Sequence, residues 1–112
     1  MSYHDEVQEK AERRAGIDYK EFIEDCDWAE LLEKYADFSN RYNKAMEELN
    51  DKHDRGTLRD LDFVDVYYYR FYRELLAGQI AYHTLKSEDY ERDRRGYWIL
   101  KTKPKKKFGF WG

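Results

Sequence analysis

"VDVYYYRFYREL", residues 64–75, places five aromatic side chains in six positions and admits three interpretations. It can form a β-strand, a stacking platform for nucleic-acid bases, or the core-facing side of a helix. The surrounding sequence favours the helix, because apolar or small residues continue at alternating steps of three and four. They are Leu61, Val64, Tyr68, Phe71, Leu75, Gly78, Tyr82 and Leu85. This spacing keeps side chains on one helix face, whereas a strand requires alternation by twos.

A ladder with the same spacing lies earlier in the chain. It consists of Trp28, Leu31, Tyr35, Phe38, Tyr42, Ala45 and Leu49. Between the two ladders lies DRGTLRD (residues 54–60), in which Gly56 suits a left-handed helix end and Thr57 a new helix start. So short a connection makes the helices antiparallel neighbours. The sequence therefore predicts an antiparallel helical hairpin of about residues 28–54 and 58–90.

Folding the chain back at this connection pairs large side chains with small ones. Tyr35 is expected to face Gly78, and Phe38 is expected to face Leu75. A glycine inside a helix costs about 1 kcal/mol relative to alanine, so the position opposite Tyr35 gives Gly78 a packing role.

The second predicted helix, about residues 58–90, carries a further apolar stripe that one partner helix cannot cover. It consists of Phe63, Val66, Tyr69, Tyr72, Leu76 and Ile80. We expect residues 3–26 to pack on this stripe, which gives a mainly α, three-helix arrangement. A homodimer through the same stripe is the alternative.

Capping residues predict the boundaries within the N-terminal segment. A first helix is expected to run to about Ala15, where Gly16 ends it, and Asp18 is expected to begin another. Asp27 can cap again, so we expect a kink or break near residues 25–27.

Charge divides the chain into two parts, although the net charge is only −3. Residues 1–91 hold every acidic residue except Asp93. Residues 92–112 are predominantly basic and rich in aromatic side chains. We therefore predict an acidic helical domain over 1–91 and a basic aromatic C-terminal tail over 92–112. Two β-prone runs in the tail, Tyr97–Thr102 and Phe108–Trp111, predict either a short β-hairpin or an extended segment.

Several kinds of site and location are not expected. The single cysteine permits no internal disulfide, and no apolar run reaches the roughly 18 residues that a transmembrane helix needs. The N-terminus lacks the apolar core of a signal peptide, so a cytoplasmic location is the expectation. His4, His53 and His83 are interpreted as solvated surface residues rather than metal ligands. No motif indicates catalysis, and no cofactor is expected.

Residues 18–33 contain a dense series of carboxylates with Lys20 as the single basic residue. Carboxylates three or four positions apart on a helix are about 5–6 Å from one another, not far from the spacing of successive phosphates in a nucleic acid. Such a face is suited to the nucleic-acid channel of another protein. The candidate partner-binding residues are Glu21, Glu24, Asp25, Glu30 and Glu33. A solubilising face, or one neutralised by the chain's own tail, is the alternative.

The tail supplies a second set of candidate partner-binding residues, which combine cations with aromatic anchors. They are Trp98, Lys103, Lys105, Lys106, Lys107, Phe108, Phe110 and Trp111. Lysines suit phosphates and rings suit bases, so the tail is also suited to single-stranded nucleic acid.

These observations favour a non-enzymatic protein-interaction module. It would bind a basic surface on a larger nucleic-acid-processing protein and inhibit it, as a virus- or mobile-element-encoded inhibitor in the host cytoplasm would do. One alternative is a nucleic-acid-binding protein that uses the tail. Another is a structural or assembly protein whose exposed tyrosines pair subunits.

Overall fold

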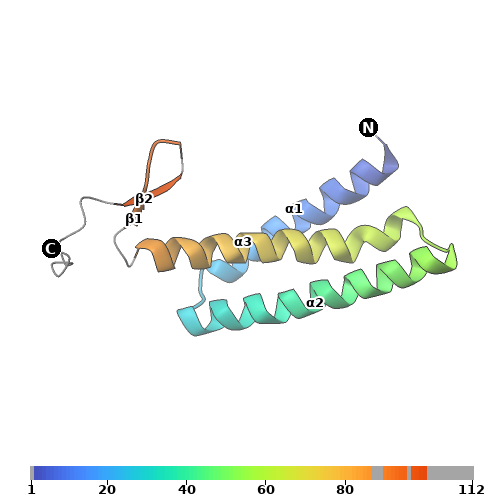
Figure 1. The fold of residues 1–112 in the computed structure, drawn as a ribbon, viewed down its shortest axis with the longest axis horizontal. Helices are drawn as coiled ribbons and strands as arrows, with labels where there is room; N and C mark the ends of the chain where they lie inside the picture. The colour runs from blue at the N-terminus through green and yellow to red at the C-terminus, as the bar shows by residue number, and fades with distance from the viewer. Residues whose placement is uncertain (1, 87–89, 96, 101–112) are drawn as a thin grey trace, which may run out of the picture. The chain divides into compact units, whose positions relative to one another are not determined.

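The computed structural model describes residues 2–86, 90–95 and 97–100. In these residues the helices are α1 (Tyr3–Ile23), α2 (Trp28–Arg55), the 3-10 helix η1 (Asp60–Phe63) and α3 (Val64–Lys86) (Figure 1). Two short strands, β1 (Tyr90–Arg92) and β2 (Trp98–Leu100), follow α3. The chain falls into two compact units, Met1–Ala77 and Gly78–Gly112. The predicted mainly α, three-helix arrangement is confirmed.

Helix α1 is a single helix, which contradicts the prediction that Gly16 ends it. Ser2 caps its start, because the Ser2 hydroxyl accepts a hydrogen bond of 3.1 Å from the Asp5 backbone N–H. Val7, Ala11 and Ala15 are buried along one face of the helix. The contacts that α1 makes with α3 continue beyond Gly16, and they outweigh the intrinsic cost of a glycine inside a helix.

The break predicted near residues 25–27 is confirmed, since α1 ends at Ile23 and α2 begins at Trp28. A reciprocal capping box starts α2. The Asp27 carboxylate accepts a hydrogen bond of 2.8 Å from the Glu30 N–H, and the Glu30 carboxylate accepts one of 2.9 Å from the Asp27 N–H. Two backbone donors that would otherwise lack a partner are thereby satisfied.

Helices α2 and α3 lie side by side and run antiparallel, as predicted (Figure 1). Gly56 ends α2 in the left-handed conformation with φ 74°. Near the turn, Lys52 Nζ donates to Asp62 Oδ1 at 2.9 Å, and farther along Arg73 Nε donates to Ser39 Oγ at 2.7 Å. The second helix differs from the predicted range of 58–90, because η1 precedes α3.

The buried side of α3 is the second apolar stripe. Tyr72 and Leu76, which belong to this stripe, are 3% and 0% exposed. Leu61, which belongs to the other set of regularly spaced residues (Leu61 to Leu85), is 56% exposed. The ring of Phe38 in α2 lies 4.4 Å from that of Tyr72, between ring centroids. The ring of Tyr19 in α1 lies 6.0 Å from Tyr72 as well. The second stripe is the core because it contacts both neighbouring helices.

The packing role predicted for Gly78 is wrong. Gly78 is exposed, and a Cβ added at this position would meet no atom of the described residues within 4 Å.

The strands β1 and β2 form an antiparallel hairpin in which Glu91 pairs with Ile99. Asp93 closes the turn, since its carboxylate accepts hydrogen bonds from the N–H groups of Arg95 (2.8 Å) and Tyr97 (2.9 Å). The predicted hairpin would instead have paired the run Tyr97–Thr102 with the run Phe108–Trp111 around KPKK (residues 103–106). The run Phe108–Trp111 lies outside the described residues, so that pairing stays a prediction.

Two glycine substitutions test the course of the backbone. We expect Gly16→Ala to raise the free energy of unfolding by about 0.5–1 kcal/mol, because alanine is the better helix former. There is room for the methyl group, since a Cβ at Gly16 would lie 3.9 Å from Phe71 Cε2.

We expect Gly56→Ala to lower the free energy of unfolding by about 1–2 kcal/mol, because the residue has positive φ. Urea unfolding of both variants measures the changes, and a destabilised Gly16→Ala would contradict the continuous helix.

Candidate partner-binding surfaces

The predicted acidic residues Glu21, Glu24, Asp25, Glu30 and Glu33 all lie on the exterior, and we refer to them as the acidic surface. They span the end of α1, the connection and the first turns of α2. Four of them, all except Glu30, form no hydrogen bond or ion pair through their carboxylates with any residue in the described part of the chain.

Several carboxylates elsewhere in the helices pair with a base one turn away. Arg13 lies 3.2 Å from Glu9, and Arg41 lies 3.0 Å from Asp37. Arg55 pairs with Asp51 in the same way. The acidic surface is therefore a concentration of negative charge that the described residues do not balance.

Glu30 has a structural role that the sequence interpretation did not assign to it. Its side chain is part of the capping box with Asp27. Glu30 thus holds the first turn of α2, and its charge also interacts favourably with the N-terminal end of the helix dipole.

Asp18 also belongs to the acidic stretch, but its side chain turns towards α3. The Tyr68 hydroxyl donates to Asp18 Oδ2 at 2.5 Å, and Arg14 Nε lies 3.5 Å from the same oxygen. Burial, together with the hydrogen bond to the Asp18 carboxylate, raises the pKa of Tyr68. Asp18 therefore joins α1 to α3 rather than contributing to the acidic surface.

The tail candidates cannot be placed as one surface. Trp98 begins β2, whereas Lys103, Lys105, Lys106, Lys107, Phe108, Phe110 and Trp111 lie outside the described residues. Their role in partner binding stays a prediction.

His4 is not the solvated residue that we expected. Its Nε2 lies 2.6 Å from the Tyr67 hydroxyl, and its Nδ1 lies 3.2 Å from Asp60 Oδ1. The edge of the ring also packs on Phe63, with 4.7 Å between centroids. The cluster fastens the start of α1 to η1 and α3. Within the ranges that the structure describes, no group of three or more His, Cys, Asp or Glu side chains is arranged to hold a metal ion.

Cys26 is half-buried beside the acidic surface. Burial raises the pKa of its thiol, and the neighbouring carboxylates of Glu30 and Asp27 raise the pKa further. The protonated thiol is therefore favoured near neutral pH, and it is a weak nucleophile.

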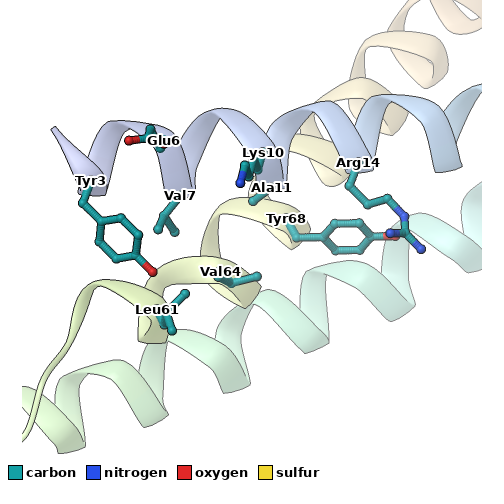
Figure 2. Close-up of a pocket in the computed structure, with 9 residues that line it drawn as sticks. All are labelled: Tyr3, Glu6, Val7, Lys10, Ala11, Arg14, Leu61, Val64 and Tyr68. Carbon is teal, nitrogen blue, oxygen red and sulfur yellow. The ribbon is translucent and has the colours of Figure 1, made fainter. Parts of the chain in front are cut away.

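A groove between α1 and the start of α3 was not anticipated from the sequence (Figure 2). This α1–α3 groove has a volume of about 310 Å³. It is lined by Tyr3, Glu6, Val7, Lys10, Ala11, Arg14, Leu61, Val64 and Tyr68. The spacing of three and four residues had placed Leu61 and Val64 in the core, and their partial exposure was therefore not predicted. The sequence feature that could have indicated the groove is the spacing of Lys10 and Arg14, which stand three residues after the apolar Val7 and Ala11.

No protein-family model matches the chain, and no curated protein or solved structure shows significant similarity to it. In the described parts of the chain, no helix combines the length and the apolar character that crossing a membrane requires. Functional assignments therefore depend on the residues and geometry of this chain alone.

The buried tyrosines predict a loss of stability in alkali. Burial and the nearby Asp18 raise the pKa of Tyr72 to about 12, above the ordinary value of 10.0. Because the unfolded chain releases this proton first, the Tyr72 contribution is complete below pH 10 and is lost between about pH 10 and pH 12. We expect the difference in free energy of unfolding between the natural chain and Tyr72→Phe to be constant up to about pH 9 and then to fall, by on the order of 1–2 kcal/mol.

Urea unfolding of both proteins across this pH range measures the difference, and the comparison removes the titration of lysines that both proteins share. A difference that does not change with pH would show that Tyr72 is not protected by the core.

Proposed function

We propose that this chain is a non-enzymatic protein-interaction module whose acidic surface binds a basic surface on a larger nucleic-acid-processing protein. By occupying that basic surface, the chain would compete with nucleic acid and inhibit its partner. A cytoplasmic location, in the host if the protein is virus-encoded, belongs to the same proposal.

The observation that carries the proposal is the local imbalance of charge. Glu21, Glu24, Asp25 and Glu33 are exposed, and no described lysine or arginine pairs with them, whereas Glu9, Asp37 and Asp51 each have an arginine partner. Like charges on a helix repel one another at spacings of three and four residues. A cationic surface would relieve this repulsion on binding, which gives the acidic surface an energetic preference for a basic partner.

The backbone that presents these carboxylates is held in place before any partner binds. The Asp27–Glu30 capping box holds the first turn of α2, and the hydrogen bond from Tyr68 to Asp18 holds the last turns of α1 against α3. Charges on a preorganised scaffold lose less conformational entropy on binding than charges on a flexible segment. This rigidity supports recognition of a partner with a matching arrangement of cations.

The aromatic and basic tail contributes to the proposal through its composition. Trp98, Phe108, Phe110 and Trp111 are residue types that serve as interface anchors, and Lys103, Lys105, Lys106 and Lys107 are suited to acidic groups or phosphates at the edge of the same interface.

Two matched variants test the role of the acidic surface. The first, Glu21→Gln/Glu24→Gln/Glu33→Gln, neutralises carboxylates of the acidic surface. The second, Glu9→Gln/Asp37→Asn/Asp51→Asn, changes the net charge by the same amount at paired sites. Affinity capture with the natural chain, followed by mass spectrometry, identifies the partner. Calorimetry with the purified partner then measures the dissociation constant for each variant.

We expect the acidic-surface variant to bind at least about tenfold more weakly, because each truncated charge contact weakens the complex. The control variant is expected to bind within about twofold of the natural chain, because exposed ion pairs within the chain contribute little. Raising the salt from about 50 to about 500 mM is expected to weaken the complex steeply through screening. Equal losses in the two variants, or affinity that does not respond to salt, would contradict the proposal.

A further inference from the structure

The α1–α3 groove gathers exposed apolar side chains that the core does not cover. Leu61 is 56% exposed, Tyr3 is 55% exposed and Val64 is 36% exposed, and all three line the groove. The buried side chains of Val7 and Ala11 lie between them on the α1 side. A small helical protein thus presents a hollow with apolar walls to solvent, which is the usual character of a ligand pocket.

The polar groups of the groove are concentrated on α1 and are cationic on balance. Lys10 and Arg14 lie one helical turn apart, and Glu6 is the single carboxylate among the lining residues. Arg14 shares its charge with Asp18, at 3.5 Å. Lys10 forms no ion pair with any residue that the structure describes. The groove therefore offers a free ammonium group beside an apolar surface, within a strongly acidic part of the chain.

The Tyr68 hydroxyl offers no free donor at its end of the groove. The Tyr68 hydroxyl already donates its proton to Asp18, so the ring contributes an apolar wall and no free donor (Figure 2). The cationic partners for an anionic ligand in this groove are therefore Lys10 and, next along the helix, Arg14.

We propose that the α1–α3 groove is a binding site for a small amphiphilic carboxylate, with the apolar part against Val7, Leu61 and Val64 and the carboxylate at Lys10 and Arg14. The volume of about 310 Å³ is close to the lower limit of ligand pockets, which is about 300 Å³. It suits a medium-chain or aromatic monocarboxylate. The proposal concerns a surface other than the acidic one, and it does not depend on the proposed function.

The probe for this site is decanoate, and its matched control is nonyltrimethylammonium, which has the same alkyl chain and a cationic head. Isothermal titration calorimetry of the full chain is expected to show saturable binding of decanoate with one site. The cation is expected to bind at least about tenfold more weakly, because Lys10 and Arg14 repel it.

Substitutions locate the site. Leu61→Glu places a carboxylate in the groove and is expected to weaken decanoate binding at least about tenfold. Ile17→Glu is the control, because Ile17 is an exposed α1 residue (51%) that does not line the groove. It makes the same change in charge and is expected to leave the affinity within about twofold of that of the natural chain. Lys10→Gln is expected to weaken binding by about two- to fivefold.

Circular dichroism verifies that each variant retains its helices. The acidic-surface variant is expected to bind decanoate like the natural chain, so failure of the proposed function leaves this result unchanged. Absence of saturable decanoate binding, equal affinity for the two amphiphiles, or equal losses in Leu61→Glu and Ile17→Glu would each overturn the proposal.

Discussion

The side chain of Tyr72 packs between two helices, against the Phe38 ring of α2 at 4.4 Å and the Tyr19 ring of α1 at 6.0 Å. Its hydroxyl donates to the backbone carbonyl of Asp18 at 3.4 Å, so the polar end of the ring is also satisfied. Aromatic side chains bury more area than aliphatic ones and gain from edge-on geometry. The core of this chain, in which 40% of the residues are charged, thus combines the rings of Phe38 and Tyr72 with buried aliphatic side chains such as Leu31, Val66 and Leu76.

The same arrangement explains the two candidate surfaces. Small residues, Ala11 and Ala15, let α1 approach α3 closely, while Val64 and Leu61 at the start of α3 and in η1 remain partly uncovered and form the groove. At the other end of α1, the chain must turn to begin α2. The capping box there uses Asp27 and Glu30, and the neighbouring carboxylates remain exposed. The two surfaces therefore lie at opposite ends of α1, and a ligand at one need not obstruct a partner at the other.

Much of the fold could be predicted, because the steps of three and four and the Gly56 turn are local properties of the chain. The sequence did not reveal which of the two adjacent stripes along η1 and α3 is buried, since Leu61 of η1 and Leu76 of α3 are equally apolar and only the position of α1 distinguishes them. The prediction that Gly16 ends the first helix was wrong for a related reason. The low helix propensity of glycine favoured a helix end there, but packing against α3 keeps α1 continuous. The exposure of Glu21 and Glu24 was predictable from their charge. The engagement of Asp18 and His4 with tyrosines more than 40 positions away was not, because it depends on tertiary contacts.

The most direct test of this arrangement compares the same truncation on the two stripes, Leu76→Ala and Leu61→Ala, by urea unfolding. Leu76 is 0% exposed, and its truncation is expected to lower the free energy of unfolding by about 2–5 kcal/mol, through lost transfer energy and a cavity. Leu61 is 56% exposed, and its truncation is expected to cost less than about 1 kcal/mol. Equal costs, or a larger cost at Leu61, would mean that the stripe beginning at Leu61 in η1 faces the neighbouring helices and that the central packing described here is wrong.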